Sequence, residues 1–440
     1  MNTPKESYLV IGGCGFLGRH IVERLVARGE PAIAVFDLVQ RHHDKNIQFF
    51  TGDLCEIEDL NKAIRQSKAT TIFHTASPMH GTNNPKLCWR VNVDGTKTVI
   101  QAAQLNGVKY LVYTSSAGVT FTGGNCIDVD ERVPLVDETN AYDTYNLTKA
   151  EGEKLILAAN DTESGKGRLR TVAIRPSGIF GPGDRQNFEG LAQVIKRGQT
   201  KWQIGDNTNL WDWTYVGNVV KAHLLAADKI RAEAHDPSLS DPSRREELCD
   251  YALPPITLTT HEHRVPTSEA RPLGPAIAPI PNGAAIEAAY YNTNPKDEVR
   301  AVWRTKYDAL TEQNIAREPT YPLQASGQAF YISNGEPIAF WDYVHAVWRA
   351  MGHVPASKIV IPNTVGIWLA TAAEWWAWAV GKQPGFTRER VGYSCSSRWF
   401  NIEKARRVLG YEPEVGIQEG IQISAKWFLE SKGVNAITPE

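Results

Sequence analysis

The chain has 440 residues, 42% of them hydrophobic and 22% charged, which is an ordinary composition for a globular protein. Its formal net charge of −2 argues against a broad basic surface, so we expect no nucleic-acid partner. The six cysteines are scattered without close pairs. This spacing favours a reducing compartment and argues against a disulfide framework or a zinc site, so no resident metal is expected.

Short apolar runs alternate with helical patterns in the first half of the chain. The expected strands are Tyr8–Ile11, Ala32–Phe36, Ile47–Phe50, Thr70–His74, Tyr110–Thr114 and Thr171–Ile174. The expected helices are Phe16–Arg28, Ile57–Gln66, Leu87–Asn106 and Tyr145–Ala159. This alternation predicts an α/β fold, with a doubly wound parallel sheet that helices cover on both faces.

A glycine-rich turn, Gly12 to Gly18, follows the first strand and opens the first helix. Glycines allow positive φ angles and let the backbone approach a pyrophosphate, whose charge the helix N-terminus also favours. A glycine motif alone is weak, but here strand, turn, helix and next strand are in register. We therefore predict a Rossmann-type, dinucleotide-binding domain over residues 1–230.

Two aspartates end the next strands. Asp37 lies about 20 residues after the last glycine, where a carboxylate binds the adenosine ribose and repels a 2′-phosphate. This favours NAD over NADP, although Arg41 nearby leaves dual use open, and a solvated loop aspartate is the alternative. Asp53, after the third strand, is placed to reach the adenine, with an ordinary turn aspartate as its alternative.

Tyr145 and Lys149 are spaced by one helical turn, so they share a helix face. A free tyrosine has a pKa of about 10, and a nearby cation favours its phenolate form. Ser115 and Ser116 end the fifth strand at the same edge of the sheet. We predict that Tyr145 takes a proton from a substrate alcohol, that Lys149 stabilises the phenolate, and that Ser116 holds the substrate oxygen. The alternative is a surface tyrosine beside a solvated lysine.

The second half of the chain changes character. Residues 231–326 contain 12 of the 25 prolines and are expected to form an irregular insertion, with one helix near Lys296–Leu310. Regular structure is expected to resume with a strand at Gln328–Ser333 and a helix at Trp341–Met351. Residues 327–440 are expected to form a smaller substrate-binding region, and 177–211 to contribute to the substrate pocket.

Val365–Val380 is an apolar stretch with four tryptophans and one charge. It is shorter than the roughly 20 apolar residues that a membrane-spanning helix needs. Tryptophan favours the membrane–water interface, so a helix lying in one leaflet is expected. A Trp-rich core helix or a lid over an apolar ligand is the alternative.

The chain resembles the extended short-chain dehydrogenase/reductases, and within them the 3β-hydroxysteroid dehydrogenase branch. The resemblance covers roughly residues 7–228 and 328–430 and rests on Gly12–Gly18, Asp53, Ser116, Tyr145, Lys149, Arg175–Arg185, Trp213–His223, Arg388–Val391 and Asn401–Tyr411. Lys196–Thr200, Gln203–Asn207 and Phe340–Asp342 are most similar to fungal enzymes that oxidise and decarboxylate 4α-carboxysterols. The long insertion and the tryptophans at 211, 213 and 399 depart from that pattern.

The resemblance implies NAD-dependent oxidation of the 3β-hydroxyl of a sterol, with loss of a 4α-carboxylate. It implies catalytic roles for Ser116, Tyr145 and Lys149. The expected cofactor contacts are Gly12, Gly15, Phe16, Leu17, Gly18, Asp37, Asp53, Leu54, Ala76, Asn92, Tyr145, Lys149 and Pro176. Arg185 is one candidate for a cation near the carboxylate, with a structural salt bridge as its alternative.

Two other functions remain open. One is a secondary-metabolite dehydrogenase acting on a 3β-hydroxysteroid or triterpenoid, and the other is a non-catalytic NAD-binding sensor or scaffold. For the sterol enzyme, we expect peripheral or monotopic contact with the cytosolic face of the endoplasmic reticulum membrane. A cytoplasmic location is the alternative, and a homodimer is allowed.

Overall fold

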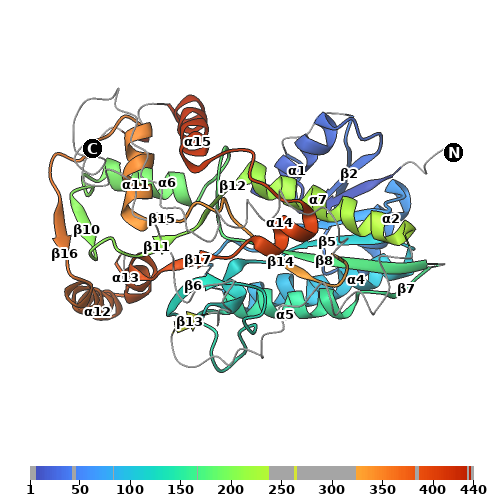
Figure 1. The fold of residues 1–440 in the computed structure, drawn as a ribbon, viewed down its shortest axis with the longest axis horizontal. Coiled ribbons are helices and arrows are strands. Elements are labelled where there is room, and N and C mark those ends of the chain that lie inside the picture. The colour runs from blue at the N-terminus through green and yellow to red at the C-terminus, as the bar shows by residue number, and fades with distance from the viewer. Residues whose placement is uncertain are drawn as a thin grey trace.

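The computed structural model describes residues 6–41, 46–82, 84–165, 167–236, 262–264, 324–381, 386–433 and 436–437. Most of the expected insertion, including the helix at Lys296–Leu310, lies outside the described residues. Figure 1 shows an elongated molecule, with the N-terminal sheet at one end and the helices of the C-terminal third mainly at the other.

A parallel sheet forms the first end of the molecule. Its order is β3 (Gln48–Thr51), β2 (Ile33–Asp37), β1 (Tyr8–Ile11), β4 (Thr71–His74), β5 (Tyr110–Thr114), β8 (Gly167–Pro176) and β14 (Ala329–Ile332). β7 (Thr162–Ser164) pairs antiparallel with β8. The strand order reverses between β1 and β4, and ligands of such sheets bind at the carboxyl ends of the strands beside this reversal.

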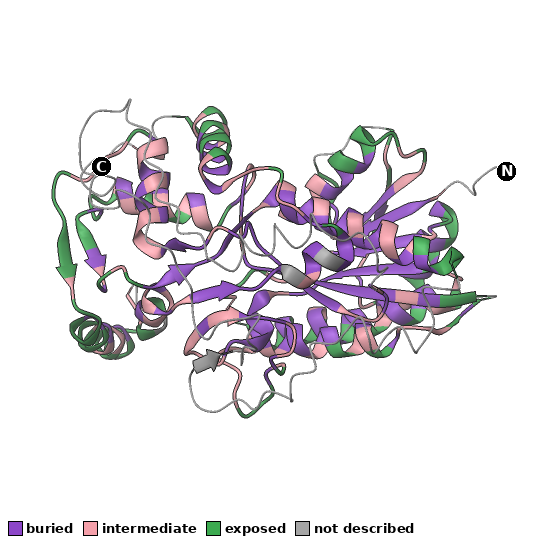
Figure 2. Ribbon diagram, in the orientation of Figure 1, coloured by how far each residue is buried: buried purple, intermediate pink, exposed green. Residues whose placement is uncertain are grey.

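Helices cover both faces of this sheet, as the apolar runs predict. Tyr8 and Val10 pack on one side with α1 (Phe16–Ala27) and α7 (Val216–His235). Leu9 and Ile11 pack on the other with α2 (Ile57–Ser67), α4 (Thr96–Leu105) and α5 (Thr144–Ala158). Alternate residues of a strand point to opposite faces, so a strand buried on both faces is apolar throughout. The inner strands β1, β4 and β5 are accordingly buried throughout, as Figure 2 shows.

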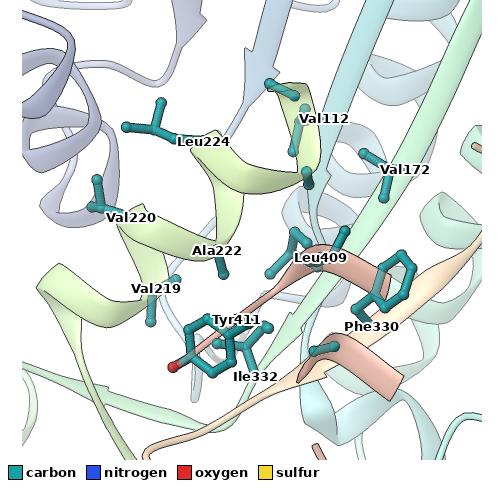
Figure 3. Packing of buried hydrophobic residues seen from close by; sticks show 14 of the residues in the cluster. Val112, Val172, Val219, Val220, Ala222, Leu224, Phe330, Ile332, Leu409 and Tyr411 are labelled. Atoms are coloured by element: carbon teal, nitrogen blue, oxygen red, sulfur yellow. The ribbon is translucent and has the colours of Figure 1, made fainter. Parts of the chain in front are cut away.

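The large sheet contains strands from both halves of the chain. β14, from beyond the insertion, pairs with β8, and α14 (Glu403–Leu409) packs on β14. Figure 3 shows Phe330 and Ile332 of β14 and Leu409 of α14 beside Val172 of β8 and helix α7. The predicted division at residue 230 therefore does not coincide with the sheet, because residues 329–332 complete it.

Smaller sheets connect the two ends of the molecule. One has the order β13 (Glu262–Arg264), β6 (Asn125–Val129), β17 (Arg398–Phe400), β11 (Leu210–Trp211) and β15 (Ile338–Ala339). The others pair β9 (Gly178–Phe180) with β12 (Trp213–Tyr215), and β10 (Trp202–Ile204) with β16 (Ile359–Ile361).

The remaining helices are α3 (Pro85–Trp89), α6 (Asn187–Lys196), α11 (Phe340–Ala350), α12 (Asn363–Ala379), α13 (Arg388–Cys395) and α15 (Ile417–Lys432). Across the described ranges, no helix is both long and apolar enough to cross a bilayer.

Candidate active site

The glycine turn joins β1 to α1, and its backbone lies so close to neighbouring atoms that only glycine fits. Gly12 has φ +80°, and a Cβ added to it would lie 2.7 Å from the backbone nitrogen of Ala76, just after β4. A Cβ on Gly18 would lie 2.2 Å from the carbonyl oxygen of Gly12. Any larger residue at either position would push the turn away from the sheet, so the glycines keep the backbone accessible to a ligand.

The N-terminus of α1 is suited to an anion. Its cap residue is Gly15, no side chain caps it, and its first turn contains no acidic residue. Phe16 is half-buried and Leu17 is buried, so they anchor the first turn. The first amides of a helix have no partner within the helix and carry partial positive charge, which favours a phosphate.

Asp37 is tied to this turn by hydrogen bonds. The Cys14 amide donates to Asp37 Oδ2 (2.9 Å), and the Leu38 amide donates to Oδ1 (2.7 Å). The carboxylate is half-buried at the carboxyl end of β2, beside the glycine turn. Asp37 therefore has a structural role at the turn, and its contact with a ribose stays a prediction.

Asp53 and Leu54 lie in the turn after β3. Asp53 Oδ2 accepts a hydrogen bond from Arg90 (2.7 Å), and Oδ1 accepts one from the Cys55 amide (2.9 Å). Leu54 is buried against Gly95, where an added Cβ would overlap it at 1.9 Å. Asp53 thus has an evident structural role, and its contact with adenine stays a prediction.

Asn92 lies in a π-helical turn, Arg90–Gly95, between α3 and α4. A single helix was predicted over Leu87–Asn106, and the structure differs because this turn interrupts it. Ser77 donates to Asn92 Oδ1 (2.9 Å), and Asn92 Nδ2 donates to Thr148 of α5 (3.0 Å). Such π-turns are frequent at functional sites, and this one links the loop after β4 to the helix that carries Tyr145.

Ser115 and Ser116 have different surroundings. Ser115 is buried and donates to Glu153 Oε2 (2.6 Å), and Glu153 forms a buried ion pair with Arg175. Ser116 is half-buried and starts a short 3₁₀ turn, where its Oγ accepts the Gly118 amide (3.0 Å). Ser116 is therefore the serine whose hydroxyl proton remains available.

Tyr145 lies in the first turn of α5, which Asp143 caps by accepting the Asn146 amide (2.7 Å). The edge of the His80 ring meets its ring, with centroids 5.1 Å apart. Burial raises the Tyr145 pKa to about 12, although a hydrogen bond with Ser77 opposes the rise. Burial thus outweighs the polar contacts of this phenol, and the effect of Lys149 on it stays a prediction.

Lys149 is 2% exposed and lies one turn further along α5. Its ammonium donates to the Thr114 carbonyl at the end of β5 and lies 4.3 Å from the centroid of the Tyr113 ring. Burial lowers its pKa to about 7, with the charge of Glu153 opposing. Lys149 thus faces the strand end, and its roles beside Tyr145 and at the cofactor stay predictions.

Pro176 ends β8 opposite Ile332 of β14. The glycine turn, the strand-end serine, Tyr145 and Pro176 therefore all lie at or beside the carboxyl end of the sheet. Sequence reasoning missed Ser77 and His80, although both follow β4 and so fall at this edge. The exposed Arg185 lies after β9, in the turn that precedes α6.

The comparisons with known proteins agree with this geometry. The sequence profile of the 3-beta hydroxysteroid dehydrogenase/isomerase family matches residues 9–242. The chain belongs to this family. Sterol-4-alpha-carboxylate 3-dehydrogenase erg26, decarboxylating, of Schizosaccharomyces pombe is 37% identical, over 96% of this chain and 98% of the relative. The decarboxylating enzyme of Homo sapiens is 30% identical, over 95% and 87%.

Solved structures match the fold. The crystal structure of gox2253 has a TM-score of 0.61 and 19% identity, covering 97% of this chain and 99% of that one. UDP-glucose 4-epimerase of Thermus thermophilus, in complex with NAD, has a TM-score of 0.53 and 20% identity, covering 96% and 98%. At this identity the likeness establishes the Rossmann-like architecture of the family member and nothing finer.

Proposed function

We propose that this enzyme oxidises the 3β-hydroxyl of a 4α-carboxysterol with NAD and that the product loses its carboxylate as carbon dioxide. The observation that carries the proposal is the placement of Tyr145, Ser116 and Asn92 at the sheet edge beside the glycine turn. The names of the relatives that align along nearly the whole chain support the sterol substrate. This arrangement also favours an enzyme over a non-catalytic sensor or scaffold.

The protein groups have distinct roles in the proposed reaction. The Ser116 hydroxyl donates to the substrate oxygen, and Tyr145 accepts the proton of the substrate hydroxyl. The bound nicotinamide supplies the acceptor for the hydride. Lys149 orients the nicotinamide ribose, and its positive charge offsets part of the cost of ionising the buried phenol.

Other residues support the site or hold the cofactor. Asn92 holds Ser77 and α5 in place. Gly12, Gly15, Phe16, Leu17 and Gly18 hold the pyrophosphate, while Leu54, Ala76 and Pro176 line the rest of the dinucleotide.

Decarboxylation follows from the position of the new ketone. The ketone is β to the carboxylate, so breaking the C–C bond releases carbon dioxide and moves the electron pair to the ketone oxygen as an enolate. Tyr145, which by then carries the substrate proton, lies at that oxygen and can donate a hydrogen bond to it. The enolate then takes a proton at carbon, and no additional oxidant is needed.

The decisive experiment measures the product and the released carbon dioxide. Purified wild-type enzyme should convert a 4α-carboxysterol and NAD into equal amounts of 3-ketosterol, NADH and carbon dioxide. Tyr145→Phe should lower kcat by at least about 10³-fold while retaining NAD binding, because it removes the proton acceptor. Tyr110→Phe, at the amino end of β5, is the matched control and should be near wild type. Oxidation of a triterpenoid alcohol but not the carboxysterol would favour the secondary-metabolite alternative, and binding of NAD without any turnover would favour the sensor.

We infer that the enzyme prefers NAD because Asp37 would oppose a 2′-phosphate. Asp37→Asn removes the charge and keeps one acceptor oxygen, so one of the Cys14 and Leu38 amides retains its side-chain partner. It should lower the ratio of kcat/KM for NAD to that for NADP by about 10- to 100-fold, the effect of one buried like-charge contact. An unchanged ratio would contradict the ribose contact.

We also propose that α12 rests on a lipid surface. Its buried positions are the small residues Gly366, Ala370 and Ala377, whereas Trp368 and Trp378 are each 78% exposed. Its only charge, Glu374, is paired with Arg388 (2.7 Å). Further exposed apolar residues on the helix and on β10 and β16 are Val365, Ile367, Leu369, Trp375, Trp376, Trp202, Ile359 and Val360. An apolar surface rich in tryptophan fits the membrane interface, and a sterol substrate supports the cytosolic face of the endoplasmic reticulum as the proposed location.

Vesicle flotation tests this contact. Wild-type protein should float with phosphatidylcholine vesicles, and Trp368→Ser combined with Trp378→Ser should abolish flotation. Leu105→Ser removes a comparably exposed apolar residue from α4 and should have no effect. If the wild type stays in the soluble fraction but the double variant halves its mass in sedimentation, a homodimer covers this face instead.

A further inference from the structure

Arg398 of β17 is a buried arginine enclosed by aromatic rings. It is 8% exposed, and its guanidinium carbon lies 4.0 Å from the ring centroid of Phe121. The ring centroids of Trp211 and Tyr393 lie at 4.9 and 5.0 Å. These cation–π contacts hold the guanidinium, but they do not neutralise its charge.

Within the described part of the chain, this guanidinium has no carboxylate partner. None of its nitrogens forms a salt bridge or donates a hydrogen bond there, and Nε is buried without an acceptor. By contrast, the buried Arg175 pairs with Glu153 (2.6 Å) and the half-buried Arg132 with Asp130 (2.7 Å). A buried cation without a carboxylate in direct contact is costly, so its retention points to an anion that arrives as a ligand.

The surroundings of Arg398 place it beside the proposed reaction. Phe121 ends the 3₁₀ turn that Ser116 begins. The Tyr393 ring lies 6.2 Å from the His80 ring, which in turn contacts Tyr145. Although burial opposes the effect, the nearby His80 ring and the charge of Arg398 help to lower the pKa of Asp143, the cap of the helix that carries Tyr145.

We propose that Arg398 binds the carboxylate of the substrate and thereby selects sterols that carry this group next to the oxidised hydroxyl. The inference rests on the proposed function, in which hydroxyl and carboxylate stand on adjacent carbons. Guanidinium and carboxylate match as a bidentate pair, and the pairing is strong where water is displaced. Carbon dioxide is neutral and loses this attraction, so the same group retains the acid and releases the product.

The ratio of kcat/KM for two sterols tests whether Arg398 binds the carboxylate. The substrates are a 4α-carboxysterol and the same sterol without the carboxyl group. Arg398→Met keeps the apolar stem against the rings and removes the charge. It should lower the ratio of kcat/KM for the carboxylated to the plain sterol on the order of 100-fold, mainly through KM for the carboxylated sterol. Arg398→Lys, which keeps the charge but not the planar fork, should fall between the two.

Two outcomes would overturn the proposal. An equal loss on both sterols would mean that Arg398 only supports the fold, and an unchanged ratio would mean that another group reads the carboxylate. Arg185→Gln tests that rival, because a selective loss in this variant would assign the role to the exposed arginine. Thermal unfolding provides the folding check: Arg398→Met should melt no lower than wild type, since it removes an unpaired buried charge.

A binding measurement separates this inference from the proposed function. Equilibrium dialysis of radiolabelled carboxysterol against protein loaded with NADH, which cannot accept a hydride, measures binding without turnover. Weaker binding to Arg398→Met than to wild type supports the carboxylate contact even if neither sterol is oxidised, a result that would refute the proposed function alone. Equal binding of carboxylated and plain sterol to the wild type would overturn the contact itself.

Discussion

Ser115 and Ser116, adjacent residues at the end of β5, have different roles. Ser115 donates to Glu153 in the middle of α5 and completes the hydrogen bonding of the buried Glu153–Arg175 pair, while Ser116 lies by the first turn of the same helix, which bears Tyr145. One position along the chain therefore separates a hydroxyl that supports a buried ion pair from one that is available to the substrate. The sequence Ser115-Ser116 alone does not reveal which serine is which.

Substituting each serine in turn should separate stability from catalysis. Ser116→Ala should lower kcat by about 10²- to 10³-fold with little change in melting temperature, because it removes a hydrogen bond to the reacting oxygen. Ser115→Ala should cost about 1–3 kcal/mol of unfolding free energy, because it removes a hydrogen bond from a buried carboxylate. Steady-state kinetics and thermal melts of both variants check this, and the reverse pattern would exchange the two roles.

Lys149 makes stability depend on pH. Its pKa is about 7 in the fold, lowered by burial, and about 10.4 in an unfolded chain. Between these values the unfolded state binds more protons, so the contribution of Lys149 to stability rises with pH from about 7 to about 10. Lys149→Met removes this dependence. The melting temperature of the variant minus that of the wild type should therefore shrink as the pH rises, and a difference that is constant over this range would contradict the buried ammonium.

At the scale of elements, the π-turn at Asn92 depends on a close approach by α5. A Cβ added to Gly152 would lie 2.6 Å from the Asn92 carbonyl oxygen and 2.6 Å from the Tyr113 hydroxyl. Gly152→Ala should therefore destabilise the protein by about 1–3 kcal/mol through overpacking and should lower kcat by displacing Asn92. Denaturant unfolding measures the first effect and turnover the second.

Gly190 of α6 provides the matched control for this substitution. It is also a helical glycine, but nothing lies within 4 Å of an added Cβ. Gly190→Ala should stabilise the protein by about 0.5–1 kcal/mol, because alanine loses less conformational entropy in a helix. If both variants lost the same stability, the close approach of α5 to Asn92 would not be the cause.

Some elements could be predicted from sequence because their cause is local. β1 and β5 have the predicted bounds, since continuous apolar runs reflect burial on both faces. The π-turn and short strands such as β11 and β15 could not be predicted, because contacts with segments far away in the sequence stabilise them. The same holds for the site. Tyr145 and Lys149 are visible as a spacing, whereas the cage around Arg398 joins positions 121, 211, 393 and 398 only after folding.

At the scale of the molecule, the Rossmann sheet is not a separable N-terminal module. β14 pairs with β8, and Phe330, Ile332, Leu409 and Tyr411 pack into the core beneath α7. A chain ending at residue 236 would lack these side chains and leave the edge of β8 open.

We expect the fragment 1–236 to lack a cooperative thermal transition and to bind NAD at least about tenfold more weakly than the full chain. Loss of several large core side chains exceeds the usual margin of stability. Calorimetry and cofactor titration of the purified fragment check this. A sharp transition near that of the full chain would show that the first 236 residues fold alone.

The position of β14, far along the chain from its partner strand β8, also has a consequence for biosynthesis. A ribosome delivers the dinucleotide-binding half first, but the strand that closes its sheet emerges only about 150 residues after β8 ends. During that interval the nascent chain presents an open strand edge and bare apolar surface, the features that promote misassembly between neighbouring chains. Chaperone occupancy of translating polysomes should accordingly peak after β8 has left the exit tunnel and fall once residue 411 has followed it.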